Sequence, residues 1–195
     1  MKNKSIIILK ITFFKQLRSL FFFLLFFFGW IGSFYYIFRD VNFFDGSREF
    51  LVIVLIFISF LAFITLPALF FHIEYLVRNR KEEYELGNKK IIRRKKGTDI
   101  IYNFEDIADI YMYVTPPKYR EDFRLWAFDN YHYAKIIMKS GEVLYLTSLL
   151  YPSGLEKVFK QYMKGVSYWR ERRWFPTTLV NFSHDRKEDD ELDSD

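Results

Sequence analysis

The stretch KKIIRRKKGTD, from Lys89 to Asp99, carries six positive charges in its first eight residues. Clustered lysine and arginine side chains bind anions, above all the phosphates of lipid headgroups and of nucleic acids. The run begins twelve residues after an apolar segment that ends at Val77, so we expect it to lie near a membrane surface. The candidate lipid-contact residues are its six basic residues, Lys89, Lys90, Arg93, Arg94, Lys95 and Lys96.

Two other interpretations of the basic run compete with lipid contact. Lysines on an edge strand discourage pairing with the edge of another sheet, so the run also suits a solvated hairpin. Nucleic-acid binding would need basic residues interleaved with exposed aromatic residues on one sheet face, and a membrane tether disfavours it. We therefore expect no nucleic-acid partner.

A second candidate for chemistry is the stretch YWRERRWF, residues 168–175. Tryptophan rings favour the headgroup level of a membrane, and arginines bind phosphates beside them. The interfacial candidates are Trp169, Arg170, Arg172, Arg173 and Trp174. The alternative is a purely structural role, as an extension of the preceding helix or as a last strand packed on the domain.

Catalytic and metal-binding patterns are lacking in the sequence. There is no cysteine, which excludes disulfides and thiolate metal ligands. His72 and Glu74 offer two ligands without a third, which favours an interfacial histidine over a metal site. Neither a nucleophile elbow, nor a phosphate-binding loop, nor a dinucleotide fingerprint occurs. We expect a protein that is not an enzyme and that uses no metal and no cofactor.

Two long apolar segments precede these candidate residues. Residues 19–38 and residues 50–71 run for 20 and 22 positions without a charge. At 1.5 Å rise per residue, each is long enough to cross a hydrocarbon core of roughly 30 Å. The sequence therefore predicts a hairpin of two transmembrane helices, with Pro67 as a potential kink near the end of the second.

The flanking charges predict the orientation of this hairpin. Residues 1–18 carry five basic residues and no acidic residue, whereas the connecting loop, residues 39–49, carries two basic and three acidic residues. Basic flanks stay in the cytoplasm, so both termini are expected there. The pattern leaves open whether residues 5–18 form a strand or an interfacial helix.

The second half of the chain changes to the two-residue period of strands. EEYEL and KKIIRR flank Gly87–Asn88, and HYAKIIMK and EVLYLTS flank Ser140–Gly141, which are two hairpin signals. DIIYNF, EDIADIYMYV and a short FRLWAF are further strand candidates. The pattern predicts six or seven strands.

One helix follows these strands, and the chain ends in an acidic tail. Ser153 and Glu156 fit the capping box, and apolar residues then recur at helical spacing as far as Gly165. Residues 184–195 hold seven acidic and two basic residues without apolar periodicity, which is typical of disorder.

Strands in hairpin order followed by one helix resemble the pleckstrin-homology-like fold, here over residues 78–178. The resemblance lies in IIYNFEDIADIYMY, YHYAKIIMKSGEVLYLTSLL and LEKVFKQYMKG. With the apolar hairpin, the chain resembles bacterial membrane proteins that carry such a domain. The resemblance implies an α+β fold, an antiparallel sheet or barrel of six or seven strands capped by one C-terminal helix.

The resemblance also implies a binding function. In lipid-binding members of the fold, basic residues around the first hairpin hold phosphorylated headgroups, and Lys89 to Lys96 fall near that place. We expect a membrane-anchored scaffold module that contacts anionic lipid, a protein partner, or both. The alternative is a regulatory or protective membrane protein, an accessory subunit or immunity factor, that acts through the hairpin itself.

Overall fold

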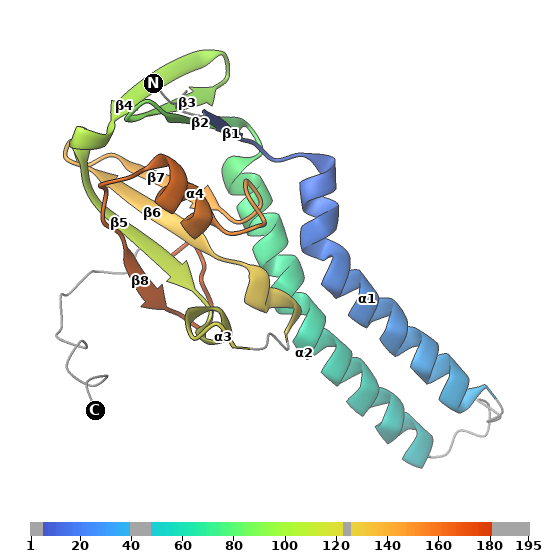
Figure 1. The fold of residues 1–195 in the computed structure, drawn as a ribbon. Coiled ribbons are helices and arrows are strands. Elements are labelled where there is room, and N and C mark those ends of the chain that lie inside the picture. The colour runs from blue at the N-terminus through green and yellow to red at the C-terminus, as the bar shows by residue number, and fades with distance from the viewer. Residues whose placement is uncertain (1–5, 40–47, 123–125, 181–195) are drawn as a thin grey trace, which may run out of the picture.

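The computed structural model describes residues 6–39, 48–122 and 126–180, so the predicted acidic tail and most of the predicted loop at 39–49 lie outside the described residues. Two long antiparallel helices project from one end of a β-rich body (Figure 1). They are α1, Phe13–Phe38, and α2, Arg48–Asn79. The ring of Trp30 in α1 lies 4.6 Å from that of Phe57 and 4.8 Å from that of Phe60 in α2, which joins the helices.

Both predicted apolar spans lie inside these helices, but the helices are longer. α1 begins six residues before position 19, and α2 continues eight residues beyond position 71. By length and composition, Leu51–Asn79 of α2 could cross a membrane. α1 qualifies only if its two segments, Phe13–Phe21 and Phe23–Tyr36, which meet at a 46° bend, count as one span.

The second half of α2 belongs to the core of the β-rich body. Ala68, Phe71, His72, Tyr75 and Asn79 are all buried, and their spacing places them on one helix face. The first half contrasts with this, because apolar side chains on several sides of the helix are exposed between Leu51 and Leu66. The first half of α2 is therefore apolar and exposed, whereas the second half of the same helix packs into the core of the β-rich body.

The first sheet combines strands from both sides of the helical hairpin. Its order is β1-β2-β3-β4, all antiparallel, with strands Ile7–Leu9, Glu82–Gly87, Lys90–Lys95 and Thr98–Asn103. In β1, Leu9 pairs with Tyr84 of β2 and is fully buried. A domain confined to residues 78–178 therefore omits one of its own strands. Residues 5–18 hold both a strand and the start of α1, where the Thr12 hydroxyl accepts a hydrogen bond from the N–H of Lys15.

The second sheet has the order β7-β6-β5-β8, and its strands are Val143–Thr147, Tyr133–Met138, Ile107–Val114 and Trp169–Arg172. β8 pairs in parallel with β5, whereas the other neighbours in this sheet are antiparallel. Three short helical turns connect strands: η2, Phe104–Asp106, α3, Pro116–Tyr119, and η3, Ala127–Asn130. The helix α4, Leu155–Tyr162, lies over this sheet in Figure 1.

Two groups of buried side chains hold these layers together. The main core joins the first sheet, the second sheet and α4 through residues such as Tyr84, Ile91, Met112, Ile136 and Phe159. The other is an aromatic cluster between α2 and the second sheet; its buried aromatic members are Phe71, Tyr75, Tyr111, Tyr113, Phe128, Tyr131 and Tyr133. The helical hairpin is thus attached to the β-rich body by packing.

The strand prediction was close in count and wrong in several boundaries. The described residues hold eight strands, and α4 is not the last element because β8 follows it. The first hairpin turns at Asn88–Lys89, which both have positive φ, one residue later than predicted, because Gly87 still pairs with Lys90. The second hairpin closes around Ser140–Gly141 as predicted.

Two local predictions failed for identifiable reasons. Part of FRLWAF, residues 123–125, lies outside the described residues, and Ala127–Asn130 form η3 instead of a strand. The Ser153–Glu156 capping box does not form, because α4 is preceded by Gly154 at φ 111° without a side-chain cap. The Glu156 carboxylate pairs instead with the Arg170 guanidinium at 3.2 Å.

Candidate functional site

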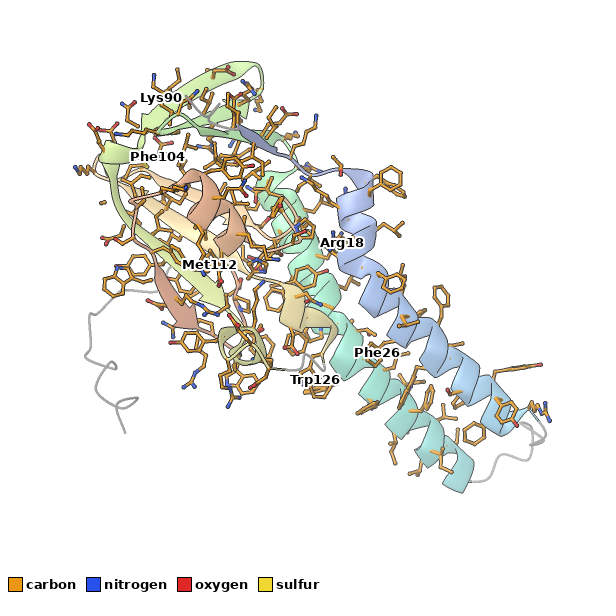
Figure 2. The ribbon with its side chains drawn as sticks, viewed as in Figure 1. Arg18, Phe26, Lys90, Phe104, Met112 and Trp126 are labelled. Carbon is orange, nitrogen blue, oxygen red and sulfur yellow. The ribbon has the colours of Figure 1, made fainter. Side chains whose placement is uncertain are left out.

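The structure divides the predicted basic run between the two ends of β3. Lys89 and Lys90 lie at one end, and Figure 2 shows Lys90 beside Phe104, far from the projecting helices. Lys95 and Lys96 lie at the other end, where Lys95 pairs with Glu82, the third residue after α2. With a rise of about 3.3 Å per residue, the five steps from Lys90 to Lys95 span roughly 16 Å. The run is therefore not one compact anion site.

Ion pairs occupy three residues of the run, Arg93, Arg94 and Lys95. Arg93 contacts Glu82 at 2.6 Å and Glu142 at 3.3 Å. Arg94 contacts two carboxylates in the same way, Glu85 at 2.6 Å and Asp99 at 3.4 Å, and Lys95 contacts Glu82 at 2.8 Å. Within the described part of the chain, the residues of the run that are exposed and form no ion pair are Lys89, Lys90 and Lys96.

Glu82 is the centre of the helix-side half of the run. Its side chain is 6% exposed and accepts a hydrogen bond from the Tyr84 hydroxyl at 2.5 Å, besides its contacts to Arg93 and Lys95. Burial by itself would raise the pKa of this carboxyl, but the hydrogen bonds from Arg93, Lys95 and Tyr84 outweigh it and lower the pKa from 4.5 to about 2. Glu82 is therefore a permanent buried anion that fixes two cations of the run.

Replacing Glu82 with glutamine should lower the free energy of unfolding by about 2 kcal/mol at neutral pH, because charge-assisted hydrogen bonds are lost. The native pKa lies below the unfolded one, so this contribution is complete above pH 4.5 and disappears as the pH falls toward about 2. Denaturant unfolding of wild type and Glu82→Gln across this range should show the difference shrinking with acid. Glu83→Gln, whose carboxylate is 43% exposed, is the matched control, and an equal loss there would contradict the assignment.

The second predicted stretch does not form one interfacial surface. Arg170 is a structural residue: its guanidinium contacts the Glu156 carboxylate at 3.2 Å, donates to the carbonyls of Lys118 and Tyr119, and lies 5.1 Å from the Tyr119 ring centre. Arg173 contacts Glu171 at 3.2 Å. The prediction of a last strand packed on the domain is therefore confirmed for β8.

Three predicted interfacial residues stay on the surface. Trp169 and Trp174 are 54% and 62% exposed, and Arg172 is exposed too. Beyond Trp174 the chain crosses α2: the Phe175 ring lies 6.2 Å from Phe71, and the Pro176 carbonyl accepts a hydrogen bond from the Tyr75 hydroxyl.

A pocket of 610 Å³, which we call the junction pocket, opens where α2, the first sheet, β7 and the C-terminal segment meet. α2 contributes an apolar face and a cation, the first sheet contributes the ion-paired groups around Glu82, and β7 contributes Val143 and Tyr145. The lining residues are Phe70, Ile73, Glu74, Val77, Arg78, Asn79, Glu82, Tyr84, Arg93, Lys95, Val143, Tyr145, Thr178 and Leu179. The pocket brings together Arg93 and Lys95 of the predicted set and excludes Lys89 and Lys90.

Arg78 lines the junction pocket but was not predicted from the sequence as a site residue. Its guanidinium carbon lies 4.1 Å from the centre of the Tyr145 ring, and one of its nitrogens lies 3.4 Å from the Thr178 carbonyl oxygen. In the described part of the chain it forms no ion pair with a carboxylate. In the sequence Arg78 is only one of several basic residues after an apolar segment, and nothing there indicates that Tyr145 and Thr178 meet it.

The acidic and histidine residues of the site region have structural partners. Glu74 is buried and accepts hydrogen bonds from the backbone N–H and hydroxyl of Thr178 and from the hydroxyl of Thr177. The His72 ring lies 3.1 Å from the Tyr131 hydroxyl, so it is a core histidine and not an interfacial one. Among the described residues, no group of three or more potential ligands is arranged to hold a metal ion.

Comparison with known proteins identifies the family of this architecture. The PH domain family matches residues 8–157, which run from β1 through both long helices and the two sheets into α4. No curated protein and no solved structure matches the chain. Two packed four-stranded sheets with helices fit this family, whose members are generally non-catalytic binding or scaffold modules. The chain therefore belongs to the PH domain family.

Proposed function

We propose that the protein is a membrane-anchored, non-enzymatic binding module that holds its PH domain at the cytoplasmic face of a bacterial inner membrane. The observation that carries this proposal is the continuity of α2. The helix is apolar and exposed between Leu51 and Leu66, and it then packs into the domain through Ala68, Phe71 and Tyr75. A helix of this kind couples a domain to a membrane without a flexible linker.

The chain connectivity supports the same proposal. β1 enters the first sheet before α1, and β2 enters it directly after α2, so both ends of the hairpin are tied into one sheet. Trp126 lies beside α2, with its ring centre 5.9 Å from that of Phe63, near the place where the helices leave the body (Figure 2). This contact attaches the start of η3 to α2.

The helix-side end of the basic run provides the polar contact in this proposal. Lys95 and Lys96 lie at the end of β3 that adjoins α2, and a juxtamembrane lysine gains about 1 kcal/mol from anionic lipid. Lys89 and Lys90, at the far end, are exposed, but β3 pairs with both β2 and β4, so the edge-strand alternative for the basic run is wrong. The alternative is that the helix-side end of the basic run binds a protein partner instead of lipid.

The absence of cysteine from the chain permits a direct test of anchoring and orientation. We expect Ser47→Cys, in the predicted outer loop, to react with a membrane-impermeant maleimide in intact cells. Ser153→Cys, an exposed position before α4, should react only after the cells are permeabilised. The reverse pattern would contradict the orientation, and recovery of the protein in the soluble fraction would contradict anchoring.

A further inference from the structure

We propose that the junction pocket binds one anionic phospholipid of the adjoining leaflet, with its acyl chains along α2 and its phosphate at Arg78. This inference rests on the proposed function, because a lipid reaches the pocket only if α2 stands in a bilayer. It goes beyond that function by assigning a defined site and ligand class in place of general contact with a charged surface.

The apolar wall of the pocket suits an acyl chain. Phe70, Ile73 and Val77 lie on one face of α2 and are 49%, 52% and 62% exposed. Leu179, 71% exposed, lies on the C-terminal segment that also lines the pocket. The same helix continues toward its start with exposed apolar residues such as Phe63 and Leu66. A chain on this wall would therefore remain in contact with apolar side chains all the way into the bilayer.

The cationic end of the pocket suits a phosphate. Arg78 lies eight residues beyond Phe70, about 12 Å farther along the helix axis. Its contacts with the Tyr145 ring and the Thr178 carbonyl hold the guanidinium at the pocket wall and leave further N–H groups for a ligand. Arginine binds phosphate through two parallel hydrogen bonds, which makes it the principal ligand-binding residue of this pocket.

Both carboxylates in the pocket already have hydrogen-bond donors of their own. Glu82 is neutralised by Arg93 and Lys95, and Glu74 is satisfied by hydrogen bonds from Thr177 and Thr178. The lining holds three cations, Arg78, Arg93 and Lys95, and two carboxylates, a net charge of +1, and Arg78 has no carboxylate partner among the described residues. The pocket therefore has a cation at one end and an apolar wall at the other.

The size of the pocket and the course of its apolar wall favour a lipid over a segment of a protein. Pockets for small ligands measure about 300–1,000 Å³, and 610 Å³ accommodates a headgroup with the first methylenes of its chains. The remaining chain length would stay in the bilayer. Because the apolar wall runs on into the exposed half of α2, the pocket has no apolar end wall of the kind that would seat a side chain from a protein partner.

The test uses the full chain in phosphatidylcholine nanodiscs that contain a small fraction of a diazirine-bearing lipid, either phosphatidylglycerol or phosphatidylcholine. We expect the phosphatidylglycerol probe to cross-link to residues 70–79 and to do so more than the phosphatidylcholine probe. Arg78→Gln should lower this cross-linking about tenfold, because a charge-assisted hydrogen bond pair is lost. Arg78→Lys should recover part of it, since the charge returns without the planar fork.

Arg80→Gln is the matched control, because Arg80 is exposed, lies two residues further on and does not line the pocket. Equal cross-linking by Arg78→Gln and Arg80→Gln would contradict a phosphate site at Arg78. Equal cross-linking of the phosphatidylglycerol and phosphatidylcholine probes would contradict a site for anionic lipid. Cross-links confined to Lys89–Lys96 would show that the lipid binds at the basic run and not in the junction pocket. Co-elution of the protein with the nanodiscs in gel filtration reports insertion separately, so failure of anchoring is distinguished from failure of the pocket.

Discussion

Replacing Phe71 with alanine should lower the free energy of unfolding of the PH domain by about 3–5 kcal/mol, the usual cost of removing a fully buried phenylalanine. Phe71 is 0% exposed, and its ring lies between 6.1 and 6.5 Å from those of Tyr75, Phe128 and Tyr131. No neighbouring element is free to fill the space, because α2, η3 and the segment around Phe175 all converge there. The loss would show that the end of α2 is domain core.

Phe70 provides the control, since it has the same side chain at the preceding position and is 49% exposed. Phe70→Ala should cost less than about 1 kcal/mol, as surface substitutions usually do. Denaturant unfolding of the full chain in detergent, followed by tryptophan fluorescence, measures both variants. If the two alanine variants lost equal stability, the face of α2 that meets the domain would have been assigned incorrectly.

Replacing Leu9 with alanine should cost about 2–5 kcal/mol, although it lies in a three-residue strand near the N-terminus. Leu9 is fully buried in the main core and pairs with Tyr84 of β2. Ile8, the next residue toward the N-terminus, points to the other face of the sheet and is 50% exposed, so Ile8→Ala should cost less than about 1 kcal/mol.

Hydrogen exchange of the β2 amides gives an independent reading of the Leu9 variant. We expect Leu9→Ala to accelerate exchange in β2, Glu82–Gly87, because opening of β1 exposes the edge that it covers. Unchanged exchange together with unchanged stability would mean that β1 does not belong to the sheet.

These two residues also decide how the PH domain can be studied. A fragment of residues 78–178 would lack both Leu9 and Phe71, and with them the edge strand of the first sheet and most of the aromatic packing of α2. Such a fragment leaves a sheet edge and an apolar face uncovered, which favours aggregation. The binding experiments above therefore use the full chain.

Short-range features were predicted well from the sequence. The Ser140–Gly141 hairpin formed where expected, because a tight turn is decided by a few adjacent residues with access to positive φ. The amphipathic α4 also formed, since its apolar spacing is local. The predicted capping box did not form, and Glu156 contacts Arg170, fourteen residues away, at 3.2 Å.

Residues whose role depends on distant partners were predicted less well. The six basic residues were grouped by adjacency in the chain, whereas an extended strand separates its two ends and alternates its side chains between faces. Arg93, Arg94 and Lys95 became members of ion pairs with residues as far away as Glu142. Arg78 gained a site role only through Tyr145 and Thr178, which lie 67 and 100 positions further along the chain.

The sequence by itself determined the two long apolar helices, the change to strands after them and the amphipathic helix α4, because these depend on composition and local periodicity. Only the tertiary structure decided that α2 is exposed in its first half and core in its second, since the same apolar residues suit lipid and protein interior equally. It also decided that β1 completes the sheet across the helical hairpin, and that α2, Lys95 and the C-terminal segment enclose one pocket. Such contacts join residues far apart in the chain, and the local sequence pattern around each residue does not predict them.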